Sequence, residues 1–252
     1  MNRILIIGYL LFIVISSINF AQDMNPEAGK LYNEGNSQLN AGNYNGAIDN
    51  YKKALTIEKD YRTYYQLGLA EKKAGKLEEA KSSLETCLQL KNNFEAGHNA
   101  LGGVFFSMGN YQAAIDNFQK VLNETSNSQT KTKVKKNISL AYAKLGSDAV
   151  SNGNPTKAIE MYQKSVEHNN YDAAYLSLAK IYSELGEYDK SISAAENALK
   201  YRNSISSGGA YYYMGISYKG KGDVTKAKEM LNKAKTDATY KKTAEYELTT
   251  LN

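Results

Sequence analysis

The sequence predicts an all-α protein, built as an α-solenoid of stacked helical hairpins, and three observations support this prediction. The chain of 252 residues contains only two prolines, so little in it opposes helix formation. A short glycine-containing string recurs six times, at intervals of 33, 34, 44, 33 and 36 residues. Ahead of the strings, large apolar residues recur at helical spacing. Self-similarity at this period is typical of repeat architectures.

Each glycine string marks a break between two helices. The clearest pair of strings begins AGNYNGAIDNYKKAL at 41–55 and MGNYQAAIDNFQKVL at 108–122. Gly accepts a left-handed helix C-cap, and the Asn that follows can cap the next helix. An Ala then precedes a large residue by four positions, as Ala114 precedes Phe118. The small residue lets two helices approach and the large one fills the gap, so each unit is predicted to be a helical hairpin.

Together the two patterns resemble the tetratricopeptide repeat family, whose pattern is W-x-x-L-G-x-x-Y, then A-x-x-x-F, then P. Tyr64-x-x-Leu67-Gly68 and Ala114-x-x-x-Phe118 carry the resemblance, which covers residues 24–237 in six units. The first Trp is replaced by Leu, Tyr or His, and the closing Pro is missing throughout. The resemblance implies a right-handed superhelix in which neighbouring hairpins stack into one continuous core.

The sequence predicts five segments. Arg3, the apolar run 4–20 and the small Ala21 have the layout of a secretory signal peptide, cleaved after residue 21. The alternative is an uncleaved anchor, which would associate the protein with a membrane. The segments are the signal peptide at 1–21, units one to three at 22–123, a polar loop and helix extension at 124–137, units four to six at 138–237, and a capping helix at 238–252.

The ten extra residues between units three and four predict a loop over 124–129 and an overlong first helix over 130–151. This segment is either a joint between two halves of the array or a tolerated surface insertion. The signal peptide predicts an exported protein of the periplasm or cell envelope, with secretion as an alternative. Cys87 is the only cysteine, so no disulfide forms within the chain.

The sequence offers no catalytic constellation, and it therefore predicts a protein that is not an enzyme and that needs no cofactor or metal. His98, His168 and Cys87 lack the spacing of metal ligands. Walker-type, G-x-S-x-G and H-E-x-x-H motifs are absent from the sequence. His98 occupies a position held by Tyr or Leu in other units, and Cys87 one held by Ala54, so both are predicted to be packing residues.

The charge balance is mildly basic, with 31 Lys and Arg against 26 Asp and Glu. This balance argues against a nucleic-acid binder, which concentrates positive charge more strongly. Lys131, Lys133, Lys135 and Lys136 nevertheless form a basic cluster. The cluster is either a solvated helix face or a docking site for an acidic partner or a membrane surface.

The family resemblance also implies a function, because tetratricopeptide arrays bind peptide segments in a concave groove lined by the first helices. It therefore predicts a scaffold or adaptor whose partner is a protein or peptide; the alternative is a structural component of the envelope that self-associates. Tyr32, Ala96 and Ala100 stand where a terminal-carboxylate clamp would need basic residues, so that clamp is not predicted. The predicted groove residues are Tyr32, Asn36, Tyr65, Leu69, Lys72, Asn99, Phe106, Lys144, Leu176, Lys180, Tyr212 and Ile216.

Overall fold

The computed structural model describes residues 24–251, which contain thirteen α-helices and no β-strand. The predicted signal segment at 1–21 lies outside the described residues. The all-α prediction is confirmed for the described part of the chain. The helices are α1 (Pro26–Asn40), α2 (Tyr44–Ile57), α3 (Tyr61–Lys73), α4 (Leu77–Leu90), α5 (Glu95–Ser107), α6 (Tyr111–Glu124), α7 (Ser128–Ser151), α8 (Pro155–His168), α9 (Asp172–Glu184), α10 (Tyr188–Lys200), α11 (Gly208–Gly220), α12 (Val224–Ala234) and α13 (Lys241–Thr249).

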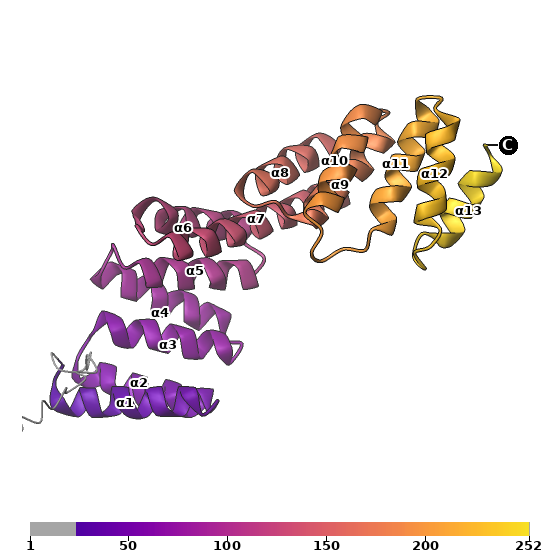
Figure 1. The fold of residues 1–252 in the computed structure, drawn as a ribbon. Helices are drawn as coiled ribbons and strands as arrows, with labels where there is room; N and C mark the ends of the chain where they lie inside the picture. The colour runs from indigo at the N-terminus through magenta and orange to yellow at the C-terminus, as the bar shows by residue number, and fades with distance from the viewer. Residues whose placement is uncertain (1–23, 252) are drawn as a thin grey trace, which may run out of the picture.

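The helices form six consecutive hairpins, from α1–α2 to α11–α12, and each hairpin packs on the next. Figure 1 shows the resulting elongated array, in which the long helix α7 joins the stack α1–α6 to the stack α8–α12. The short helix α13 packs against α12 at the C-terminal end of the array (Figure 1). This is the α-solenoid of hairpins with a capping helix that the sequence predicts.

A glycine with positive φ lies in the turn of every hairpin. The six φ angles fall between 68° and 79°, a region that disfavours side chains with a Cβ. In four hairpins the residue after this glycine caps the second helix: Asn110, for example, accepts a hydrogen bond from the backbone N–H of Ala113 at 3.2 Å. Local chemistry thus ends one helix and starts the next. These turns are the physical basis of the recurring glycine strings.

In most hairpins a large side chain of the second helix packs directly against a small residue of the first helix. A Cβ added to Gly102 would lie 2.7 Å from the Phe118 ring, so the ring lies directly on the helix backbone. In the fifth hairpin Ala195 stands where the large residue belongs. Ser191 there donates a hydrogen bond from its Oγ to the carbonyl oxygen of Ala179 at 2.7 Å. The other pairs of this kind are Gly35–Tyr51, Gly68–Leu84, Gly146–Tyr162 and Gly215–Leu231.

Helix α7 begins two residues before the predicted start at 130, and the loop is limited to 125–127. The reason is local: the side chain of Asn127 accepts a hydrogen bond from the backbone N–H of Thr130 at 2.9 Å and caps the helix earlier. The capping helix begins at Lys241 rather than at the predicted 238. Asp237 accepts the backbone N–H of Thr239 at 2.8 Å, which holds the preceding residues in a turn.

One carboxylate holds the loop between α10 and α11. Asp172, the first residue of α9, is 2% exposed, and its Oδ2 accepts the backbone N–H groups of Asn203 at 2.7 Å and Ile205 at 3.1 Å. Ser204 donates both its backbone N–H and its hydroxyl to the same carboxylate. Burial alone would raise the pKa of Asp172, but these donors outweigh burial and lower the pKa to about 2.

Candidate functional site

The first helices of three successive hairpins, α3, α5 and α7, share one face that is hollowed. A pocket of about 230 Å³ lies on it, which we call the inner pocket. Its lining comes from all three first helices and from Phe118 of α6. The inner pocket is lined by Lys72, Gly103, Phe106, Ser107, Phe118, Asn137 and Leu140.

A larger pocket of about 630 Å³, here the outer pocket, lies at the N-terminal end of α5. The extra turns at the start of α7 form one wall of it, and the loop between α4 and α5 forms another. Phe94, Ala96, Val121 and Val134 supply an apolar lining, while polar and charged side chains surround it. The outer pocket's polar and charged residues are Lys91, Asn93, Glu95, Asn99, Thr130 and Lys133.

Both pockets lie along the same side of α5. Ala96 and Asn99 line the outer pocket, and Gly103 and Phe106 line the inner one, so the lining residues follow one another at helical spacing. We call the two pockets together the α5 groove. Its walls come from α5 and α7, and from α3 at the inner pocket. It unites the predicted residues Lys72, Asn99 and Phe106.

Lys72 is the most unusual charge in the α5 groove. Its side chain crosses from α3 toward α5, because a Cβ added to Gly103 would lie 2.8 Å from the Lys72 Nζ. Lys72 is half-buried, and burial, with a smaller contribution from Lys73, lowers its pKa. Within residues 24–251 it makes no ion pair. The α5 groove thus contains a partly desolvated cation without a carboxylate.

Two predicted groove residues, Tyr65 and Leu69, lie on α3 and are half-buried against the core of the second and third hairpins. The Tyr65 ring packs edge-on against Phe94 of the outer pocket, with ring centroids 5.2 Å apart. Burial raises the pKa of the Tyr65 hydroxyl above its ordinary value, as expected for a ring enclosed by apolar neighbours. Tyr65 therefore supports the wall of the outer pocket.

The predicted groove residues of the first hairpin, Tyr32 and Asn36, contact its second helix. Tyr32 is only 7% exposed and packs against Tyr51, with ring centroids 6.0 Å apart. Asn36 accepts a hydrogen bond from the Tyr51 hydroxyl at 2.7 Å. Both side chains are thus engaged in packing between α1 and α2. They offer a partner less surface than the sequence pattern suggests.

The remaining predicted residues lie in the second half of the array. Leu176 and Tyr212 are half-buried, and Tyr212 packs against Tyr240 with ring centroids 5.5 Å apart. Ile216 is half-buried, and the exposed Lys180 lies 3.9 Å from Glu184. These residues do not line the α5 groove.

Lys144 is one residue out of register with the other predicted positions. Gly146 packs on Tyr162 as Gly102 packs on Phe118, and this match aligns Ala143 of α7 with Asn99 of α5. The exposed Lys144 therefore lies one position after Ala143, the residue that aligns with the predicted groove residue Asn99.

Thr130, Lys133, Asn137 and Leu140 of α7 line the pockets but were missed by sequence reasoning. Their spacing of three, four and three residues places them on one face of a helix. That spacing runs from the insertion into the fourth unit, and it is a signal that could have found them.

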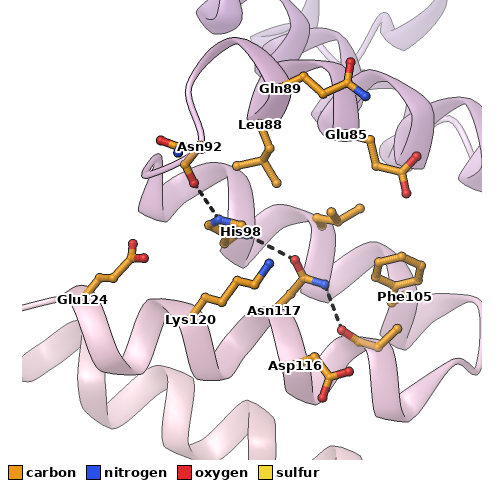
Figure 2. A pocket seen from close by; sticks show the side chains of 12 residues that line it. Glu85, Leu88, Gln89, Asn92, His98, Phe105, Asp116, Asn117, Lys120 and Glu124 are labelled. Atoms are coloured by element: carbon orange, nitrogen blue, oxygen red, sulfur yellow. Dashed lines mark hydrogen bonds between the residues drawn. The ribbon is translucent and has the colours of Figure 1, made fainter.

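Another hollow, of about 720 Å³, lies between α4 and α6, the second helices on either side of α5. Figure 2 shows His98 of α5 between the Asn92 carbonyl oxygen, 2.9 Å from Nε2, and the Asn117 Oδ1, 3.2 Å from Nδ1. Asn117 in turn donates to the Ala113 carbonyl oxygen at 2.9 Å (Figure 2). His98 is 6% exposed, so it is the packing residue that the sequence predicts.

Metal chemistry finds no support in the described residues. Among residues 24–251, no three His, Cys, Asp or Glu side chains gather closely enough to hold a metal ion. Cys87 is fully buried, and burial raises its thiol pKa to about 12, which suppresses the reactive thiolate. No helix in this part of the chain is long and apolar enough to span a membrane.

Family models described as "Tetratricopeptide repeat" match residues 31–61, 61–94, 143–210 and 209–238. Together these matches cover more than half of the chain. The chain is a tetratricopeptide repeat protein. The matched segments fall on the hairpins described above, so the tetratricopeptide pattern and the packing coincide.

Curated tetratricopeptide proteins resemble this chain over short segments. The Hsp70-Hsp90 organizing protein of Triticum aestivum is 30% identical over 97 residues, which cover 38% of this chain and 17% of that protein. Small glutamine-rich tetratricopeptide repeat-containing protein 2 of Mycosarcoma maydis is 28% identical over 95 residues, 37% of this chain and 27% of that protein. The matched segment spans roughly a quarter or less of either relative's length.

Solved tetratricopeptide structures share the fold over longer stretches. YrrB, described as a TPR protein with an unusual peptide-binding site, is 22% identical with a TM-score of 0.51, and the match covers 78% of this chain and 96% of YrrB. MamA from Desulfovibrio magneticus RS-1 is also 22% identical, with a TM-score of 0.52. That match covers 70% of this chain and 94% of MamA. At this identity the similarity establishes the common fold.

Proposed function

We propose that this protein is a non-enzymatic adaptor that holds a segment of a protein partner in the α5 groove. The observation that carries the proposal is that α3, α5 and α7 together line two hollows with side chains that the core does not need. The side chains of Lys72, Asn99 and Asn137 make no hydrogen bond or ion pair within the described residues. Polar side chains beside aromatic surface are typical of binding sites in general, including those for protein partners.

The layout and lining of the α5 groove favour a peptide over a small metabolite. The inner and outer pockets hold about 230 and 630 Å³, and they follow one another as a track along α5, as the side-chain sites of a peptide would. Phe94 and Phe106 offer large apolar contact areas along this track. A further support is the name of the wheat relative, which describes a protein that organises two chaperones.

The proposal includes export to the periplasm or cell envelope, which rests on the sequence of residues 1–21 alone. The expected result is that the protein recovered from cells begins near Gln22. Intact-mass measurement of the protein purified from its native envelope fraction tests this part. A full-length mass would identify the segment as a retained anchor.

Selection of peptides from a random displayed library tests the binding proposal. The bait is the array of residues 22–252, and the expected result is a set of enriched peptides that bind it. The variant Tyr65→Ala plus Phe106→Ala should lose these peptides, because it removes an aromatic ring from the inner pocket and the ring that packs against Phe94 of the outer pocket. A circular dichroism melt establishes that the double variant is folded.

A matched control removes exposed apolar side chains from second helices outside the α5 groove. Ile57 and Val224 are 38% and 43% exposed, and Ile57→Ala plus Val224→Ala should retain the selected peptides. Retention of all selected peptides by the Tyr65→Ala plus Phe106→Ala variant, if it is folded, would contradict the assignment to the α5 groove.

A further inference from the structure

We infer that the α5 groove selects an extended segment carrying two acidic side chains four residues apart, one bound at Lys72 and the other at Lys133. This inference rests on the proposed function and names the class of partner. The extra turns of α7 are what create the second cationic position.

The extension of α7 is unlike the other first helices of the array. It makes α7 24 residues long, whereas the other first helices have 13 to 15 residues. Thr130 and Lys133 lie in the added turns and face α5, because both line the outer pocket. Without these turns the N-terminal end of the groove would be open on one side.

Positive charge in the α5 groove exceeds the negative charge that faces it. Lys91 and Lys133 line the outer pocket against the single carboxylate of Glu95, and Lys72 lines the inner pocket, where no carboxylate is present. Lys91 is already engaged, since its Nζ donates to the Tyr61 hydroxyl at 3.1 Å and lies over the Tyr61 ring. Lys72 and Lys133 make no ion pair among residues 24–251.

A carboxylate from a partner is the group that best satisfies these two lysines. Lys72 is half-buried and lines the inner pocket together with Phe106, Phe118 and Leu140, and burial lowers its pKa. A buried charge that gains an opposite charge and a hydrogen bond recovers much of what desolvation costs. Lys131, Lys135 and Lys136 are exposed on the same extension and add long-range attraction for an acidic segment.

The amides of the groove fit the main chain of an extended segment. Asn99 lines the outer pocket and Asn137 the inner pocket, and neither side-chain amide is hydrogen-bonded within the described residues. An amide can donate to a peptide carbonyl and accept from a peptide N–H at the same time. An extended strand leaves these groups free, whereas a helix uses them internally.

The separation of the pockets sets the spacing of the acidic residues. The part of α5 that lines the outer pocket is centred about eight residues before the part that lines the inner pocket, or about 12 Å at the helical rise of 1.5 Å. An extended chain covers about 12 Å in four residues. Side chains four residues apart point to the same side of an extended chain, so both acids face the groove.

Fluorescence anisotropy with a defined peptide tests the inference. The probe is a capped, labelled Ser-Glu-Leu-Ser-Leu-Glu-Ser, which places two Glu four residues apart. Two control peptides have the length of the probe. Ser-Gln-Leu-Ser-Leu-Gln-Ser lacks the negative charges, and Ser-Leu-Glu-Glu-Leu-Ser-Ser has the composition of the probe but places the two Glu side by side. We expect the probe to bind at least fivefold more tightly than either control and to weaken as salt rises.

Matched variants of the protein assign the contacts. Lys133→Gln should weaken the probe about fivefold, as expected for an exposed charge pair, and Lys72→Gln should weaken it at least as much, because Lys72 is half-buried. Lys131→Gln changes the same charge on the same extension but does not line the outer pocket, and it should weaken the probe less than twofold. Equal effects of Lys131→Gln and Lys133→Gln would overturn the inference and indicate diffuse attraction instead.

The inference and the proposed function fail in distinguishable ways. Peptides selected from the random library that need Tyr65 and Phe106 but contain no acidic pair would overturn the inference and leave the proposed function standing. Absence of probe binding up to millimolar concentration would also overturn the inference. Displacement of the probe by phosphatidylserine vesicles, with equal effects of all three lysine variants, would assign the basic surface to a membrane instead.

Discussion

The ring of Phe118 lies on the backbone of Gly102, so closely that a Cβ at Gly102 would stand 2.7 Å from the ring. This contact between α5 and α6 recurs with other pairs along the array, and it sets how near the two helices of a hairpin approach. The neighbouring Gly103 faces the α5 groove, where an added Cβ would meet only the flexible Lys72 Nζ. Two adjacent glycines of one helix therefore have different roles.

We predict that Gly102→Ala destabilises the protein and that Gly103→Ala does not. Gly102→Ala forces the hairpin apart and should lower the free energy of unfolding by about 1–2 kcal/mol. Gly103→Ala should be neutral or raise it by up to about 1 kcal/mol, because Ala favours helix over Gly. Urea unfolding followed by circular dichroism measures both. An equal effect of the two substitutions would show that the Phe118 contact does not limit the hairpin spacing.

The carboxylate of Asp172 should make the second half of the array sensitive to acid. Its pKa is lowered to about 2 in the folded protein, against about 3.9 in an unfolded chain. The stabilisation is therefore complete above about pH 4 and is lost as the pH falls toward 2. Thermal melts between pH 6 and pH 2 measure this loss.

Asp172→Asn is the matched variant for the acid effect. It keeps the size of the side chain but removes the charge that accepts the backbone N–H groups of Asn203 and Ile205. We expect it to lower the free energy of unfolding by about 2 kcal/mol at pH 7. The variant should also lose less stability than the wild type between pH 4 and pH 2. A full acid response in Asp172→Asn would assign that response to another group.

The thiol of Cys87 should be inert in the folded protein. It is 0% exposed, and its pKa is raised to about 12 by burial. We predict that a disulfide exchange reagent such as 5,5′-dithiobis(2-nitrobenzoic acid) reacts with Cys87 only after denaturation with guanidinium. Reaction in the native state at the rate of a small-molecule thiol would show that the hairpin around Cys87 opens readily.

The sequence predicts the hairpins well because their causes are local. The turn glycines, the capping Asn residues and pairs such as Ala114–Phe118 lie within fifteen residues of one another, so each unit repeats the complete pattern. One feature that depends on distant contacts was not predicted: Asp172 accepts hydrogen bonds from residues more than thirty positions away.

Three of the predicted groove residues lie close together, and the reason is again the local repeat pattern. Lys72, Asn99 and Phe106 follow from the repeat register, and the structure places them together. Tyr32 follows from the same register, but in the first hairpin its ring packs on Tyr51. Lys133 lies in an insertion without a counterpart in other units, so no register could assign it to the groove.

Site-specific photo-crosslinking tests the central claim most directly. Benzoylphenylalanine replaces Phe106 in the inner pocket or, as a control, Ile57 at the exposed end of α2, and each protein is irradiated with the acidic probe peptide. The account predicts crosslinks from position 106 that unlabelled probe suppresses, and none above background from position 57. Equal crosslinking at the two positions, or crosslinking at position 57 alone, would contradict binding in the α5 groove.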